Sequence, residues 1–388
     1  MSADTQLKLL KDFQCIADKC PDDCCHGFTV NVDVETELNW KALPDSDIKQ
    51  RVFSSLTGEG KTTSLQKNSQ GICQLLDSGL CAIQKSVGHD YLPKICRDFP
   101  RLTTGRDERP VFTAYMSCPE IARLLVENKE SASELFTSLI DTEIDAKTLS
   151  ADPLQAEKLL QLYIYKLLAH VETSVGEIVY LTGTMLQRMI SRATIRQALQ
   201  DLETVCFSDE ALQKSIDNIR KQFRNRRLIL KKNRAGELWH FSAMNCRALQ
   251  HSDYADLWEP FNQSETDPSI FYSEVSKLKT GSRSLDQAVQ HTLKKYLEVK
   301  FVNYGFPYAC HETRLVATFL DCLVGLSQIL LLLWLLGQKG KISQQDLVNV
   351  IYRVERGLVH NDLVSNRLLQ YAERLDEDGY ILSFLYLS

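Results

Sequence analysis

Eight of the twelve cysteines in this 388-residue chain lie within its first 118 residues. Thiolates at this density bind zinc ions or iron-sulfur clusters, because soft sulfur ligands suit these metals. Eight unrelated buried cysteines are a poor explanation, since the rest of the chain holds only four. We therefore predict a metal site, and its candidate ligands are Cys15, Cys20, Cys24, Cys25, Cys73, Cys81, Cys96 and Cys118.

The cysteine spacing favours iron-sulfur over zinc. Zinc modules usually carry tight C-x2-4-C pairs that close a tetrahedron. Here the first group reads Cys15-x4-Cys20-x3-Cys24-Cys25, and the later cysteines are separated by seven or more residues. This looser pattern resembles a scattered iron-sulfur shell, and zinc remains the alternative. The spacing leaves open one four-cysteine site, two such sites, or a mixed set in which His26 replaces a thiolate.

The bulk properties describe an ordinary protein of the reducing cytosol. The start of the chain, MSADTQLKLLKDFQC, lacks the basic, apolar and cleavage regions of a signal peptide, so we expect a cytoplasmic protein without disulfides. A net charge of −5 and a pI near 6.0 give no overall attraction to nucleic acid. No nucleic-acid partner is therefore expected.

The distribution of glycine and proline along the chain changes near residue 118. Glycine and proline break residues 1–118 into short pieces, which predicts an irregular cysteine-rich module. Residues 119–388 carry long segments of helical period, which predicts a multi-helix domain and a mainly α fold. Four segments show this period most clearly. The first begins at Asp152-Pro153, and the others are Ile178–Ile190, Leu285–Val299 and Leu347–Leu358. The last follows Ser343-x-x-Asp346, which reads as a capping box.

Two segments bear on membrane contact. Leu315–Leu336 is apolar and long enough to span a bilayer, but it contains Asp321, so a core helix is the better interpretation. Arg220–Arg234 holds eight basic and no acidic residues, which suits either a solvated helix face or contact with anionic lipid or an acidic partner. The sequence thus leaves open peripheral membrane association and a homo-oligomer.

Four N-terminal motifs resemble a known family. They are Phe13-x-Cys15, Asp22-Asp-Cys-Cys-x-Gly27, Cys73-x-Leu-Leu-Asp-Ser-Gly-Leu-Cys81-x-Ile-Gln84 and Leu92-Pro-x-x-Cys-Arg-Asp-Phe-Pro-Arg101. Together they resemble the cysteine-cluster proteins described as zinc- or iron-chelating. Within that group the chain looks most like the flagellin lysine N-methylases of enteric bacteria. The likeness covers roughly the first 120 residues.

The resemblance implies methyl transfer from S-adenosylmethionine to lysine ε-amines of flagellin, in an enzyme that depends on a [4Fe-4S] cluster. The C-x3-C-x2-C triplet typical of radical enzymes is absent, because Gly27 stands at the third position after Cys20 and Cys24. A polar route needs a deprotonated lysine in line with the sulfonium. The sequence does not choose between a polar and a radical route, and it identifies no catalytic residue.

Two arginines beside Cys96 are candidate cofactor-binding residues. Arg97 and Arg101 could neutralise a thiolate-rich cluster or grip the carboxylate of the methyl donor, because guanidinium pairs with such groups through two hydrogen bonds. An ion pair of Arg97 with Asp98 on a surface turn is the simpler alternative.

Two other classes of protein remain open. One is a non-enzymatic cysteine-cluster scaffold, in which zinc or iron-sulfur only folds the N-terminal module. The other is a redox protein, which would show a reversible cluster potential without affinity for S-adenosylmethionine.

Overall fold

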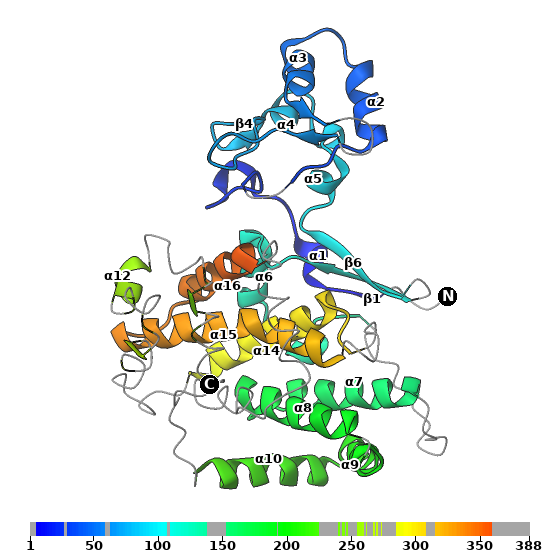
Figure 1. Ribbon diagram of the computed structural model, residues 1–388, viewed down its shortest axis with the longest axis vertical. Helices are drawn as coiled ribbons and strands as arrows, with labels where there is room; N and C mark the ends of the chain where they lie inside the picture. Colours follow the sequence, from blue (N-terminus) through cyan, green and yellow to red (C-terminus); the bar gives the residue numbers. More distant parts are fainter. Residues whose placement is uncertain are drawn as a thin grey trace.

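A computed structural model describes residues 5–26, 29–58, 63–106, 109–137, 153–191, 193–224, 285–307 and 315–358, and scattered residues between 240 and 273. These residues form a small upper lobe and a larger body of stacked helices (Figure 1). The predicted mainly α fold is confirmed. The predicted domain division at residue 118 stays a prediction.

The upper lobe is built from short elements around a small apolar core. Its strands pair as the hairpins β2–β3 and β4–β5. Trp40 is fully buried at its centre and donates its indole N–H to the carbonyl of Tyr91 at 2.8 Å. The elements are η1 (Ala17–Lys19), α2 (Val34–Ala42), α3 (Asp47–Ser54), β2 (Leu56–Thr57), β3 (Ser64–Leu65), β4 (Leu76–Asp77), β5 (Leu80–Cys81), α4 (Ala82–Ser86), η3 (His89–Tyr91) and α5 (Lys94–Asp98).

A three-stranded sheet connects the lobe to the helical body. In order β1–β7–β6, the short β1 (Thr5–Gln6) runs parallel to β7 (Arg109–Ala114), which pairs antiparallel with β6 (Arg101–Arg106). After β1 the chain forms α1 (Leu9–Asp12). The side chain of Asn303 at the end of α14 joins this sheet to the body, because it accepts from Thr113 Oγ1 at 2.8 Å and donates to the carbonyl of Ala114 at 2.9 Å.

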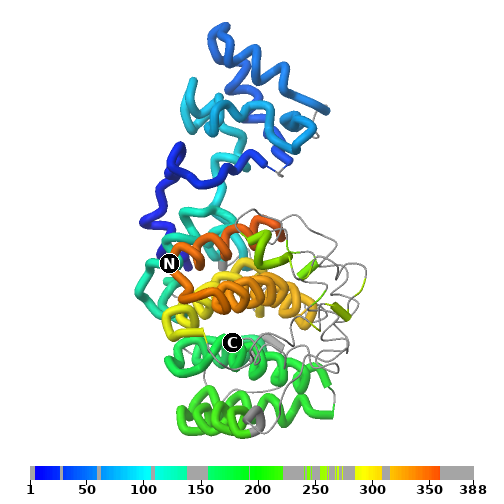
Figure 2. The backbone as a smooth tube through the Cα atoms, turned by 90° about the vertical axis from the view of Figure 1, so that its left-hand side faces the viewer, coloured from blue at the N-terminus to red at the C-terminus, as the bar shows by residue number. Residues whose placement is uncertain are grey.

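The helices of the body lie in layers. Both views show α16 and α6 next to the lobe, then α15 and α14, then α7 and α8, with α9 and α10 farthest away (Figures 1 and 2). The elements are α6 (Pro119–Glu127), η4 (Ala132–Glu134), α7 (Pro153–Ala169), α8 (Val175–Ile190), α9 (Ile195–Phe207), α10 (Asp209–Arg224), α12 (Ala255–Trp258), α14 (Gln287–Asn303), α15 (Leu315–Lys339) and α16 (Gln344–Leu358).

Helical periodicity and capping signals explain several of these helices. The apolar face predicted after Pro153 is buried in α7, with Leu160 and Leu167 fully inaccessible. The predicted capping box begins α16, where Asp346 N–H donates to Ser343 Oγ at 3.1 Å and Ser343 N–H donates to the Asp346 carboxylate at 2.8 Å. These predictions are confirmed.

The apolar segment α15 lies inside the body. It is long and apolar enough to cross a membrane, but 89% of its most apolar window is buried in the structure. The core-helix interpretation therefore fits the observed packing. In the basic run, Arg220 pairs with Glu177 at 2.7 Å, whereas Arg226, Arg227, Lys231, Lys232 and Arg234 lie outside the described residues.

Candidate metal centre

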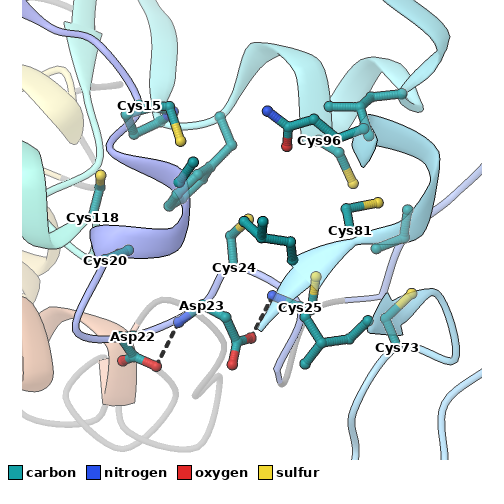
Figure 3. Close-up of a pocket in the computed structure, with 18 of the residues that line it drawn as sticks. Cys15, Cys20, Asp22, Asp23, Cys24, Cys25, Cys73, Cys81, Cys96 and Cys118 are labelled. Carbon is teal, nitrogen blue, oxygen red and sulfur yellow. Dashed lines mark hydrogen bonds between the residues drawn. The ribbon is translucent and has the colours of Figure 1, made fainter. Parts of the chain in front are cut away.

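All eight N-terminal cysteines line one cavity between the upper lobe and the helical body (Figure 3). The cavity contains about 1160 Å³ of empty space, counting its part open to solvent. Cys15 and Cys20 flank η1, and Cys24 and Cys25 follow on the next loop. Cys73 lies before β4, Cys81 ends β5, Cys96 is in α5, and Cys118 caps α6. The fold thus gathers into one place the thiols that the sequence singled out.

Local backbone structure carries the thiols to this cavity. The β4–β5 hairpin turns through two residues, Ser78 and Gly79, which both have positive φ (53° and 81°). A two-residue turn with positive φ at both residues matches the twist of the flanking strands, and positive φ favours glycine. It places Cys81 opposite Leu76 in the ladder. Cys73 is held beside Cys25, because its N–H donates to the carbonyl of Cys25 at 3.0 Å.

The eight thiols form two sets across the cavity. Cys24, Cys25, Cys73, Cys81 and Cys96 lie on one side and make up what we term the five-thiol set; Cys15, Cys20 and Cys118 make up the three-thiol set (Figure 3). Ionisation of Cys96 is disfavoured first by burial and then by Cys24, Cys81 and Cys73, and that of Cys118 first by burial and then by Cys20 and Cys15. Cys24 also disfavours ionisation of Cys20, so the two sets adjoin there. Among the described residues, no three His, Cys, Asp or Glu side chains converge closely enough to hold a single metal ion.

Burial keeps most of these thiols protonated in the metal-free chain. It raises the pKa of Cys73, Cys81 and Cys96 above the ordinary value, and it raises that of Cys118 to about 12. The pKa of Cys24 instead lies below the ordinary value, because a hydrogen bond from the Cys25 thiol stabilises its thiolate. Because thiolates are the metal ligands, metal binding here would release protons.

An ion pair joins the cysteine loop to the helical body. Arg356, in the last turn of α16, has its Nη1 2.8 Å from Oδ2 of Asp22 and its Nη2 3.9 Å from Oδ1 of Asp23. All three residues line the cavity. His26 lies against the Asp23 carboxylate at 2.6 Å and is not among the lining residues. The mixed ligand set with His26 stays a prediction.

Two buried polar atoms at this cavity have no hydrogen-bond partner. They are Oγ of Ser117, a residue only 2% exposed, and Nη2 of Arg356. Both residues line the cavity, and sequence reasoning found neither of them. No local motif signals Arg356, because it reaches the cavity through the packing of α16 against α6. Ser117 could have been found as the residue directly before Cys118.

The two arginines proposed from the sequence lie elsewhere. Arg97 donates to the carbonyl of Asp90 at 3.1 Å. Arg101 places its guanidinium 5.1 Å from the ring centre of Phe13. Neither residue is among those that line the cavity, although Phe13 is. Their role in binding a cofactor stays a prediction.

The three other cysteines that the structure describes lie outside this site. Cys206 in α9 is buried, with its sulfur 3.4 Å from the carbonyl oxygen of Leu159. Cys322 is fully buried in α15, and Cys246 is 3% exposed in the large core. Cys310 lies outside the described residues. None of the three described thiols lines the cavity.

The structure combines a cysteine-lined cavity with a body of stacked helices, and most of that body matches a known family. Residues 161–384 match the model of the FliB lysine N-methylase C-terminal domain. This range is more than half of the chain and begins within α7. The chain therefore belongs to the FliB lysine N-methylase family, a family of methyltransferases.

Curated relatives agree with this assignment. The chain is 21% identical to the lysine-N-methylase of Salmonella typhimurium, across 99% of this chain and 98% of that protein. It is 26% identical to the lysine-N-methylase of Salmonella choleraesuis over 45% of each chain. It is also 26% identical to the flagellar biosynthetic protein FliU of Salmonella muenchen, over 33% of this chain and 79% of that protein. No solved structure matches.

Proposed function

We propose that this chain transfers methyl groups from S-adenosylmethionine to lysine ε-amino groups of flagellin, in the cytoplasm, and that its cysteine cavity holds a [4Fe-4S] cluster. The observation that carries the proposal is the gathering of all eight N-terminal thiols at one cavity that abuts the family-matching helical body. Flagellin as substrate is supported by the flagellar name of one relative.

The donor set suits an iron-sulfur cluster. Zinc would need four ligands about 2.3 Å from one point, and the described side chains do not converge in this way. The five-thiol set instead spreads over one wall of the cavity and offers more than the four thiolates that a [4Fe-4S] cluster takes. Cys24, Cys73, Cys81 and Cys96 would hold the cluster, with Cys25 beside Cys24. When bound, the cluster would supply redox-active iron close to the donor.

The net chemistry balances without another reactant. The methyl carbon leaves the sulfonium sulfur as its C–S bond breaks, and it forms a bond with the lysine nitrogen. The lysine ammonium loses one proton to solvent, and S-adenosylhomocysteine is released. The electron pair of the nitrogen forms the new bond, so the overall transfer consumes no external oxidant or reductant.

The reaction is tested with purified components. Flagellin incubated anaerobically with the protein and S-adenosylmethionine should gain mass in whole methyl increments, and omission of either should leave its mass unchanged. The same comparison can be made with flagellin from cells with and without this chain. Identical flagellin masses in all incubations would contradict the methyltransferase proposal. A metal scaffold or a redox protein would then be the better account.

The cofactor is tested separately by composition. Protein purified without oxygen after iron-replete growth should be brown and contain iron and acid-labile sulfide. Colourless protein with stoichiometric zinc would contradict the cluster and leave the methyl transfer to be judged by flagellin mass alone. A reversible cluster potential together with no binding of S-adenosylmethionine would favour the redox alternative.

A further inference from the structure

The lining of the cavity combines cationic, hydroxyl and acidic groups. Arg356 reaches it from the last turn of α16, and Ser117 lies directly before α6, against which α16 packs. Asp22 and Asp23 come from the loop between Cys20 and Cys24 (Figure 3). We call these four residues the polar corner. Three chain segments far apart in sequence therefore contribute polar groups to the lining of the same cavity.

The polar corner has hydrogen-bond donors that lack an acceptor. Ser117 is almost completely buried, yet its Oγ has no hydrogen-bond partner. Nη2 of Arg356 also has no hydrogen-bond partner, and it lies 3.9 Å from the Asp23 carboxylate in an ion pair. The other guanidinium nitrogen, Nη1, is already paired with Asp22. Buried polar groups are nearly always hydrogen-bonded in folded proteins, so two orphan donors at one cavity indicate a missing acceptor. A ligand oxygen entering the cavity would satisfy them.

The charges of the corner select the kind of ligand. A guanidinium prefers the two oxygens of a carboxylate or phosphate. A group carrying only negative charge would also meet the carboxylates of Asp22 and Asp23, which are 27% and 21% exposed. A zwitterionic α-amino acid resolves this conflict, because its carboxylate can bind Arg356 and Ser117 while its ammonium lies near the two aspartates.

We propose that the polar corner binds the amino-acid end of the methyl donor, with Arg356 and Ser117 as carboxylate-binding residues. This inference rests on the proposed function, because it takes S-adenosylmethionine as the donor. The cavity is partly open to solvent, so a ligand can enter it from outside, and both carboxylate-binding residues are part of its lining. The donor would then share the cavity with the cysteine thiols.

The first test compares two ligands on the unaltered protein. S-adenosylhomocysteine keeps the amino-acid end, whereas 5′-methylthioadenosine has the same adenosine and thioether without it. Equilibrium dialysis with the full-length protein, purified anaerobically, should show about tenfold to hundredfold tighter binding of S-adenosylhomocysteine. Equal affinity for the two ligands would overturn the polar corner as the carboxylate site while leaving the donor itself intact.

The second test uses matched variants. Ser117→Ala and Arg356→Gln should each weaken binding of S-adenosylhomocysteine by about tenfold or more and leave binding of 5′-methylthioadenosine unchanged. Arg353→Gln is the control, because Arg353 lies one turn earlier on α16 and contacts the rings of Tyr254 and Tyr352 outside the cavity. An equal loss in Arg353→Gln and Arg356→Gln would contradict the assignment.

Additional readouts separate binding from folding. Ser117→Ala removes a hydroxyl that has no partner, so its melting temperature and iron content should equal those of the unaltered protein. If Arg356→Gln fails to fold, Ser117→Ala and the ligand comparison decide the question. Failure of the unaltered protein to bind S-adenosylmethionine or S-adenosylhomocysteine would overturn the proposed donor, which is a different result from binding without preference for the amino-acid end.

Discussion

Nη1 of Arg356 lies 2.8 Å from Oδ2 of Asp22, so a residue in the last turn of α16 is paired with the loop that carries Cys24 and Cys25. The two side chains are only 18% and 27% exposed. The helical body therefore contributes directly to the electrostatics of the cysteine cavity. It also favours the thiolate of Cys24, whose pKa is lowered first by the hydrogen bond from Cys25 and further by Arg356.

A double-mutant cycle should detect this link. We expect Arg356→Gln and Asp22→Asn to show a coupling free energy of about 1 kcal/mol in urea unfolding, because both partners are largely shielded from solvent. The pair of Lys166 with Asp209 is the control, since Asp209 is 92% exposed, and it should show little coupling. Equal coupling in the two pairs would mean that the Arg356 contact adds nothing specific to the cavity.

Replacement of single cysteines should separate the two thiol sets. Cys96→Ser removes a half-buried thiol of the five-thiol set and should abolish iron and sulfide in anaerobically purified protein. Cys118→Ser, in the three-thiol set, should keep most of the iron if the five-thiol set holds the cluster. Cys206→Ser is the control, because that thiol is buried in the helical core. Metal analysis checks all three, and equal loss of iron in Cys118→Ser would extend the cluster site to both sets.

The sequence predicted the helices more fully than it predicted the residues that line the cavity. Buried faces such as that of Leu160 and Leu167, and the capping box of Ser343 and Asp346, depend on neighbours within one helix. Short-range spacing therefore reveals them. The cysteine density in the same way indicated the eight thiols that line one cavity, since that signal also lies within one stretch of the chain.

Tertiary contacts explain what the sequence could not reveal. Arg356 reaches the cavity because α16 packs against α6, whereas Ser117 reaches it as the neighbour of Cys118. No spacing rule connects residues so far apart. Conversely, Arg97 is next to Cys96 in sequence, but the direction of its side chain leads it to the carbonyl of Asp90. Adjacency to a candidate ligand was therefore a weak guide to which arginine lines the cavity.

The buried pair of Lys300 and Glu355 should be sensitive to loss of one partner. Lys300 Nζ lies 2.8 Å from both carboxylate oxygens of Glu355, and Tyr296 Oη donates to the same carboxylate at 2.6 Å. Lys300→Met should destabilise the protein by about 3 to 5 kcal/mol, because it leaves an unpaired buried carboxylate. Adding Glu355→Leu should recover much of the loss in urea unfolding. A double variant less stable than the single one would contradict this account.

Close packing at Gly325 should make a single methyl group costly. A Cβ at this position of α15 would overlap Tyr296 Oη and come within 2.9 Å of Glu355 Oε1. Gly325→Ala should therefore destabilise the protein by about 1 to 3 kcal/mol. Gly337→Ala, on the same helix, meets nothing within 4 Å and should stabilise by about 0.5 to 1 kcal/mol through helix propensity. Thermal melts of the two variants should shift in opposite directions, and matching shifts would refute the packing argument.

Glu298 should make stability depend on pH. This residue of α14 is 5% exposed, and burial raises its pKa from 4.5 to about 8. Between these values the unfolded chain has lost a proton that the folded chain keeps, so stability should fall as pH rises from 4.5 to 8.

Glu298→Gln keeps the shape of the side chain and removes the titration. The variant should match the unaltered protein near pH 4.5 and exceed it in stability by a few kcal/mol at pH 8, at about 1.4 kcal/mol per pKa unit. Urea unfolding at several values from pH 5 to pH 8 measures the difference. The range stops there because burial lowers the pKa of Lys294 and of Lys295 to about 8, so their effect on stability appears above that pH. Parallel pH profiles for the two proteins would show that Glu298 is ionised in the folded state.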